Sequence, residues 1–286
     1  MLAFLLISLR ALFPIESIPL KHPCEVCENY IVCNQMEPVL KSFPDSVTSK
    51  FIDIFQYQCE RTGNYYFYTN DTLFNLYVDS IIEKHRNLLL NHPEFYPSLF
   101  ELGKSYFDRD SILKSLLIFE SVKKFNDSLP KLNYYIGLCM SKLNLHTEAM
   151  YYYHKSITFL DDTNPIIKTA LYYHCAKTKL YTKEVDSAFI FYKSIDWFYR
   201  DQDYYVLEEF MNIISEDSIF QMEIYQRLII HLAENKNARI PDLNTYRSKE
   251  VQDESILKHH FYASILYTFF ESHPNEKDIY VSIRDR

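Results

Sequence analysis

The stretch that decides the fold runs from residue 102 to residue 119 and reads LGKSYFDRDSILKSLLIF. It returns 34 positions later as IGLCMSKLNLHTEAMYYY, with a glycine, a small residue and a large side chain each kept in place. A third copy stands 39 positions beyond the second and carries Ala176, Ala188 and Tyr192 at the corresponding places. A recurrence of this length is typical of arrays in which each unit is one pair of helices. The sequence therefore predicts a row of helical hairpins.

Apolar residues spaced at i, i+3 and i+4 predict two helices in each unit, joined by a turn of a few residues. The predicted pairs are Pro97–Phe107 with Ser111–Phe125, Leu132–Leu143 with Thr147–Leu160, Ile166–Leu180 with Asp186–Tyr199, and Tyr204–Ile214 with Ser218–Glu234. Short turns force the helices of a pair to run antiparallel. Small residues such as Gly103 and Gly137 permit close backbone approach inside a pair.

Three regions are expected along the chain. Residues 1–45 hold five prolines and three cysteines and form an irregular leader. Residues 46–235 carry the helical repeats, which are clearest over 96–200 and are preceded by two further helices. Residues 236–286 begin with a polar loop and continue as a single capping helix from about Asp253 to Phe270, whose wide apolar face would cover the open end of the array.

The first thirteen residues are apolar apart from Ser8 and Arg10, which makes them a candidate signal peptide. No basic residue precedes the apolar run, and no small-x-small cleavage site follows it. An ordinary amphipathic N-terminal helix is the other interpretation, so a cytoplasmic location is slightly favoured over a secreted or extracytoplasmic one. The run is too short and interrupted to predict a membrane span.

The composition disfavours several classes of function. The chain has only three glycines, where average usage would supply about twenty, and it contains no glycine-rich phosphate-binding motif. Nucleotide-dependent enzymes are therefore disfavoured, and few turns with positive φ are expected. The formal net charge is −8 and the 30 basic residues are scattered along the sequence. Nucleic acid is not an expected partner.

One cluster near the N-terminus contains the residue types that bind zinc or form disulfides. Its members are His22, Cys24, Cys27, Cys33 and Cys59. A C-x2-C pair can hold one edge of a tetrahedral zinc ion, but a second clear pair is missing. Zinc, disulfides and ordinary thiols all remain open for this cluster. Cys139 and Cys175 lie within predicted repeat helices and are expected to be small core residues.

The sequence offers no convincing catalytic group. His174 and Cys175 are adjacent on a predicted helix and point about 100° apart, so they cannot form a hydrogen-bonded dyad by themselves. Carboxylate pairs such as Asp161-Asp162 are typical of a repeat junction or a solvated helix face. We therefore expect a protein that is not an enzyme and that needs no cofactor.

The repeats resemble those of the tetratricopeptide repeat superfamily. In that family each unit carries large, small and aromatic residues in a fixed order, and three units of this chain carry matching residues. In the first unit these are Leu99, Leu102, Gly103, Tyr106, Ser115, Phe119 and Val122; in the second, Ile136, Gly137, Met140, Ala149, Tyr153 and Ser156; in the third, Tyr172, Ala176, Ala188, Tyr192 and Ile195. The terminal proline of the family is absent from all three units, and Lys179 replaces an aromatic residue in the third. The resemblance implies an all-α fold, namely a right-handed solenoid of antiparallel helix pairs.

The resemblance also implies a concave groove lined by the first helix of each pair. The residues at the groove positions are Phe100, Lys104, Tyr134, Leu138, Tyr173 and Lys177. The competing interpretation is that several of these aromatic side chains are packed against neighbouring repeats. The leading hypothesis is a scaffold or adaptor that binds a peptide segment of another protein in this groove. The alternative is a structural subunit of a larger assembly, with its edges or convex face buried.

Overall fold

The computed structural model describes residues 40–62, 71–160, 165–195, 203–234 and 254–284. Regular structure in these ranges is helical throughout, and none of them contains a strand. This confirms the all-α class. The chain divides into two compact units, residues 1–125 and residues 126–286, and the division falls after the first 34-residue repeat. Each unit is described by itself.

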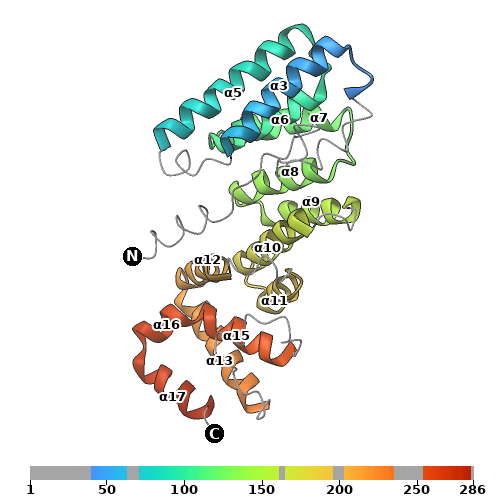
Figure 1. Cartoon of the computed structure of the whole chain (residues 1–286). Coiled ribbons are helices and arrows are strands. Elements are labelled where there is room, and N and C mark those ends of the chain that lie inside the picture. The colour runs from blue at the N-terminus through green and yellow to red at the C-terminus, as the bar shows by residue number, and fades with distance from the viewer. Residues whose placement is uncertain (1–39, 63–70, 161–164, 196–202, 235–253, 285–286) are drawn as a thin grey trace, which may run out of the picture. The chain divides into compact units, whose positions relative to one another are not determined.

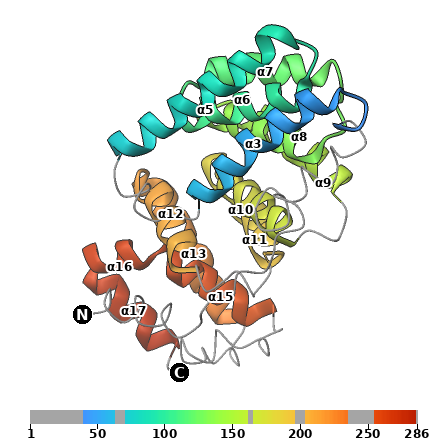
Figure 2. The ribbon, with the colours of Figure 1, turned by 45° about the horizontal axis from the view of Figure 1, so that its top comes forward.

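The first unit holds four described helices: α3 (Asp45–Thr62), α5 (Asp71–Asn91), α6 (Tyr96–Asp108) and α7 (Ile112–Lys123). Helices α3 and α5 run side by side (Figures 1 and 2), α5 also packs on α6, and α6 pairs with α7. The core of this unit gathers aromatic rings from several elements. Phe51 of α3 lies edge-on to Phe95, with ring centroids 5.3 Å apart. The two helices expected ahead of the clear repeats are thus confirmed.

The second unit contains the other three predicted pairs. Their helices are α8 (Pro130–Lys142) with α9 (His146–Phe159), α10 (Pro165–Tyr181) with α11 (Val185–Lys193), and α12 (Asp203–Ser215) with α13 (Ser218–Glu234). Helix α10 packs on α8, α9 and α12 as well as on its own partner α11. The predicted second helix of the third pair ran to Tyr199, but α11 ends at Lys193 and residues 196–202 lie outside the described ranges.

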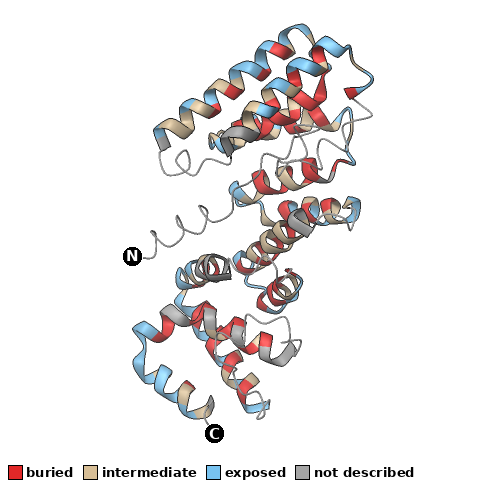
Figure 3. Cartoon of the chain, viewed as in Figure 1, coloured by how far each residue is buried: buried red, intermediate tan, exposed pale blue. Residues whose placement is uncertain are grey.

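The C-terminal prediction of one helix from Asp253 to Phe270 was wrong. The structure has three helices there: α15 (Glu254–Ile265), α16 (Tyr267–Ser272) and α17 (Pro274–Arg284). The chain leaves helical geometry at Leu266, and it does so again at His273, whose φ of −130° and ψ of 72° suit a residue that precedes proline. Helix α15 packs on α11, α12 and α13, while α17 packs on α13 and α16 and is largely exposed (Figure 3).

The turns inside the hairpins share one geometry. Asp110, Asn144 and Lys183 have φ values of 53°, 59° and 63°, and they recur at the same spacings as the sequence repeat. In each turn the amide of the next residue donates to a carbonyl five residues back, for example Leu145 N to Met140 O at 2.9 Å. This hydrogen bond is typical of the C-terminal cap of an α-helix in which the capping residue adopts the left-handed conformation. Positive-φ residues are few in the described part of the chain, as expected, and at these three turns Asp, Asn and Lys take the place of glycine.

The small residues that recur in the repeats are explained by the rings opposite them. A Cβ atom added to Gly103 would lie 2.5 Å from a ring carbon of Phe119, and one added to Gly137 would lie 2.5 Å from a ring carbon of Tyr153. Both rings are fully buried. The ring therefore occupies the volume that a side chain would need, and the two helices of a pair can approach closely. Cys139 and Cys175 are also fully buried, which confirms them as small core residues.

Candidate functional site

The two predicted groove residues of the first unit do not form an open surface. Phe100 is buried and its ring contacts that of Phe119, with centroids 5.8 Å apart. Lys104 is also buried, and its ammonium donates to Glu101 Oε2 at 2.8 Å. The physical reason is that α5 covers α6 in this unit, so the exposed face expected for a first repeat is used for packing.

Lys104 and Glu101 belong to a buried polar cluster that the sequence did not reveal. His85 of α5 and Ser98 of α6 are fully buried, and His85 Nδ1 lies 2.8 Å from Ser98 Oγ. Gln58 of α3 donates from Nε2 to Glu101 Oε2 at 3.5 Å. Desolvation lowers the pKa of His85 to about 4, against the opposing influence of the Glu101 carboxylate and with a smaller contribution from Lys104. The imidazole is therefore neutral near pH 7.

In the second unit two of the predicted groove residues, Tyr134 and Tyr173, lie near one another. Tyr134 and Tyr173 are half-buried, and both contact the ring of His174, with centroids 5.6 Å and 4.8 Å away. Tyr173 also stacks on Phe210 of α12, at 5.9 Å between centroids and 10° between ring planes. Leu138 is buried. The ring contacts thus run over α8, α10 and α12 and form what we call the aromatic edge, in which Tyr134 and Tyr173 keep part of their surface exposed.

Charge at this edge comes from Lys177 and Glu209. Their side chains form an ion pair between α10 and α12 and are 21% and 41% exposed. Desolvation lowers the pKa of Lys177, and nearby Lys142 acts in the same direction. Desolvation also lowers the pKa of His174 to about 3, with a further contribution from Lys177. The edge therefore combines two half-buried tyrosines, a neutral imidazole and a paired lysine.

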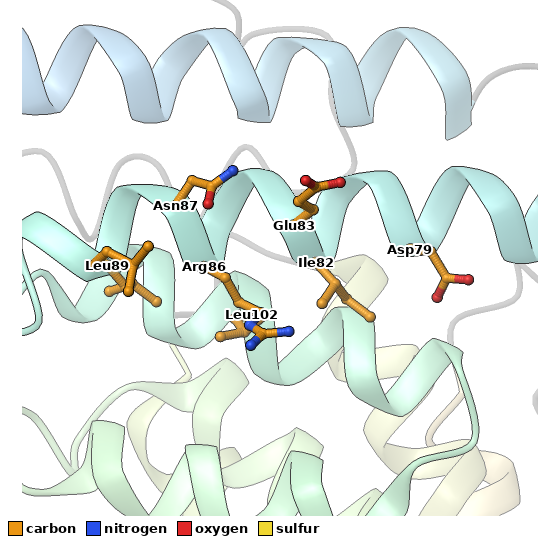
Figure 4. A pocket seen from close by; sticks show the side chains of 8 residues that line it. Asp79, Ile82, Glu83, Arg86, Asn87, Leu89 and Leu102 are labelled. Atoms are coloured by element: carbon orange, nitrogen blue, oxygen red, sulfur yellow. The ribbon is translucent and has the colours of Figure 1, made fainter.

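The first unit has a shallow hollow of about 650 Å³ along α5. It is lined by Asp79, Ile82, Glu83, Arg86, Asn87, Leu89, Leu90 and Leu102. Figure 4 shows these side chains on successive turns of α5, with Leu102 contributed by α6. Arg109 bonds Asp79 at 2.7 Å across its rim. The mixture of both charge signs with leucine gives no defined chemistry to this hollow.

The cysteine hypothesis lies mostly beyond the described residues. His22, Cys24, Cys27 and Cys33 fall within residues 1–39, and Cys59 belongs to α3 but its side chain is not described. Within the described ranges, no group of three or more His, Cys, Asp or Glu side chains could hold a metal ion. None of the described helices is both long and apolar enough to span a bilayer. The candidate signal peptide likewise lies outside these ranges.

Comparison with known proteins adds no assignment. No protein-family model and no curated protein matches this sequence.

Proposed function

We propose that the chain is a non-catalytic helical-repeat scaffold, similar to tetratricopeptide repeat proteins, that binds a segment of another protein. The observation that carries the proposal is the recurrence of one hairpin construction in both units. It combines a left-handed turn residue, the hydrogen bond that spans that turn, and a small residue opposite a buried ring. Hairpins of this kind bury their apolar faces by stacking on neighbours, and a right-handed solenoid is the arrangement we propose for them.

We place the binding site on the aromatic edge of the second unit. Tyr134 and Tyr173 are held by ring contacts on one side, so binding would immobilise few additional rotamers. Lys177 supplies a positive charge beside them, which suits a segment with apolar anchors and an acidic side chain. Phe100, Lys104 and Leu138 are left out of this site because they are buried.

The test is quantitative capture of bound proteins by the full chain and by two triple variants. The site variant combines Tyr134→Ala, Tyr173→Ala and Lys177→Glu. The matched control combines Tyr152→Ala, Tyr181→Ala and Lys155→Glu; Lys155 is 21% exposed and pairs with Asp127, as Lys177 pairs with Glu209. We expect the site variant to lose at least tenfold in partner recovery while the control retains it. Equal recovery by both folded variants would refute this site.

A specific observation favours the alternative of an assembly subunit. Tyr151 and Ile190 occupy the same repeat position on the second helices of two hairpins of the second unit, and they are 62% and 55% exposed. Large apolar side chains repeated at one exposed position are typical of surfaces that another protein covers. Light scattering during size exclusion distinguishes the two functions, because a stable and soluble monomer at high concentration would contradict an obligate subunit.

A further inference from the structure

Three polar atoms in the interior of the first unit have no hydrogen-bond partner among the described residues. They are Gln58 Oε1 of α3, His85 Nε2 of α5 and Glu101 Oε1 of α6. The side chains of His85 and Glu101 are both 0% exposed. Leaving a buried polar group unpaired costs on the order of 1–3 kcal/mol, so three together require an explanation.

Hydrogen bonds place the side chains that carry these atoms near one another. Gln58 Nε2 lies 3.5 Å from Glu101 Oε2, which brings the amide and the carboxylate side by side. His85 Nδ1 lies 2.8 Å from Ser98 Oγ, and Ser98 stands one turn before Glu101 on α6. The Glu101 carboxylate also acts electrostatically on the His85 imidazole, so the polar side chains from α3, α5 and α6 are neighbours in this part of the interior.

The donors and acceptors of the three groups are complementary to one water molecule. Gln58 Oε1 and Glu101 Oε1 can only accept hydrogen bonds. If the Ser98 hydroxyl donates to Nδ1, the neutral His85 carries its proton on Nε2 and can only donate there. A water molecule donates twice and accepts, so it satisfies all three atoms at once, which fits the usual two to four partners of a buried water.

We propose that one buried water molecule is bound between Gln58, His85 and Glu101, where it joins α3 and α5 to the first repeat hairpin. A metal ion is disfavoured because the ammonium of Lys104 already bonds the Glu101 carboxylate at 2.8 Å and would repel a second cation there. Direct pairing of the three groups is disfavoured because two of the three atoms are acceptors and only one donor faces them.

The test is a high-resolution crystal structure of the full chain combined with magnetic relaxation dispersion of water in solution. We expect a single density peak within hydrogen-bond distance of all three atoms, without anomalous signal. We also expect Gln58→Leu to lose one long-lived water relative to the wild type, and Gln56→Leu, at an exposed position of the same helix, to lose none. Anomalous signal from a metal, direct contact among the three groups, or an unchanged water count in folded Gln58→Leu would each overturn the proposal.

Discussion

Lys104 in the first unit and Lys177 in the second stand at the same repeat position but in different surroundings. Lys104 and its partner Glu101 are 10% and 0% exposed, whereas Lys177 and its partner Glu209 are 21% and 41% exposed. The first pair lies within one helix, and the second connects two helices. The repeat therefore determines where a side chain stands on its helix, and the neighbouring helix determines whether it faces solvent.

The interiors of the two units also differ in how polar they are. The first unit encloses a charged and polar cluster around Glu101 and His85 beside its aromatic core. The C-terminal part of the second unit is dominated by apolar and aromatic contacts, with Phe261 of α15 packed against Phe189, Tyr192 and Phe210. Burial of apolar area is largely insensitive to single charges, while a buried polar cluster depends on every member. The two units should therefore respond differently to loss of a charge.

The largest expected effect comes from removing one member of each ion pair. Lys104→Met leaves the Glu101 carboxylate buried and uncompensated, and we expect the free energy of unfolding to fall by about 3–5 kcal/mol. Lys177→Met removes a half-exposed pair and should cost about 0–1 kcal/mol. Urea unfolding followed by circular dichroism measures both. Equal losses would show that the two environments do not differ in practice.

The second expected effect concerns pH. The pKa of His85 is lowered from 6.5 to about 4 in the folded chain, so the unfolded chain takes up this proton first as the pH falls. The contribution of His85 to the free energy of unfolding is fully present above pH 6.5. It is lost as the pH falls toward 4, and the total loss is about 3 kcal/mol. The pKa of His174 is also lowered, so its contribution has the same sign.

The matched variants for this prediction are His85→Gln and, at an exposed position, His154→Gln. Chemical unfolding at several pH values between 4 and 7 should show a flatter pH dependence for His85→Gln and an unchanged one for His154→Gln. A wild-type slope retained in His85→Gln would show that other groups carry the acid sensitivity.

The third effect tests whether the buried rings require the small residue opposite them. An alanine at position 137 would place its Cβ 2.5 Å from the Tyr153 ring and 3.3 Å from the carbonyl oxygen of Ala149, so the pair of helices must shift. We expect Gly137→Ala to destabilise the chain by about 1–3 kcal/mol, despite the better helix propensity of alanine. Thermal unfolding measures the loss. The double variant Gly137→Ala with Tyr153→Leu should recover part of it, and a stabilised single variant would contradict the packing.

The hairpins themselves could be predicted from the sequence because their signal is local. Glycine or alanine recurs sixteen residues before an aromatic side chain, and this fixes both the pairing and the register of two helices. The prediction of Ser218–Glu234 matched α13 at both ends. The α17 helix was missed because Pro274 to Asp278 is polar, so the apolar period that indicates a helix is short there.

The candidate site could be predicted only in part, because exposure depends on elements distant in sequence. Phe100 and Tyr173 hold equivalent repeat positions, and nothing in the 34-residue pattern distinguishes them. The burial of Phe100 depends on how α5 packs, and the partial exposure of Tyr173 depends on α12. The cluster of His85 and Glu101 was invisible for the same reason, since its members come from three helices.

The smallest expected effect comes from substituting the turn residues that have positive φ values. Lys183 holds a φ of 63°, which is unfavourable for a residue with a Cβ, whereas Asn144 at 59° belongs to a type that tolerates this region. Glycine at position 183 should relieve up to about 1 kcal/mol of backbone strain. The lysine also pairs with Asp217, and at an exposed site this pair contributes about 0–1 kcal/mol. We therefore expect Lys183→Gly to raise the melting temperature slightly and Asn144→Gly to leave it nearly unchanged. A clear loss in Lys183→Gly would mean that the ion pair to Asp217 matters more for this hairpin than the turn does.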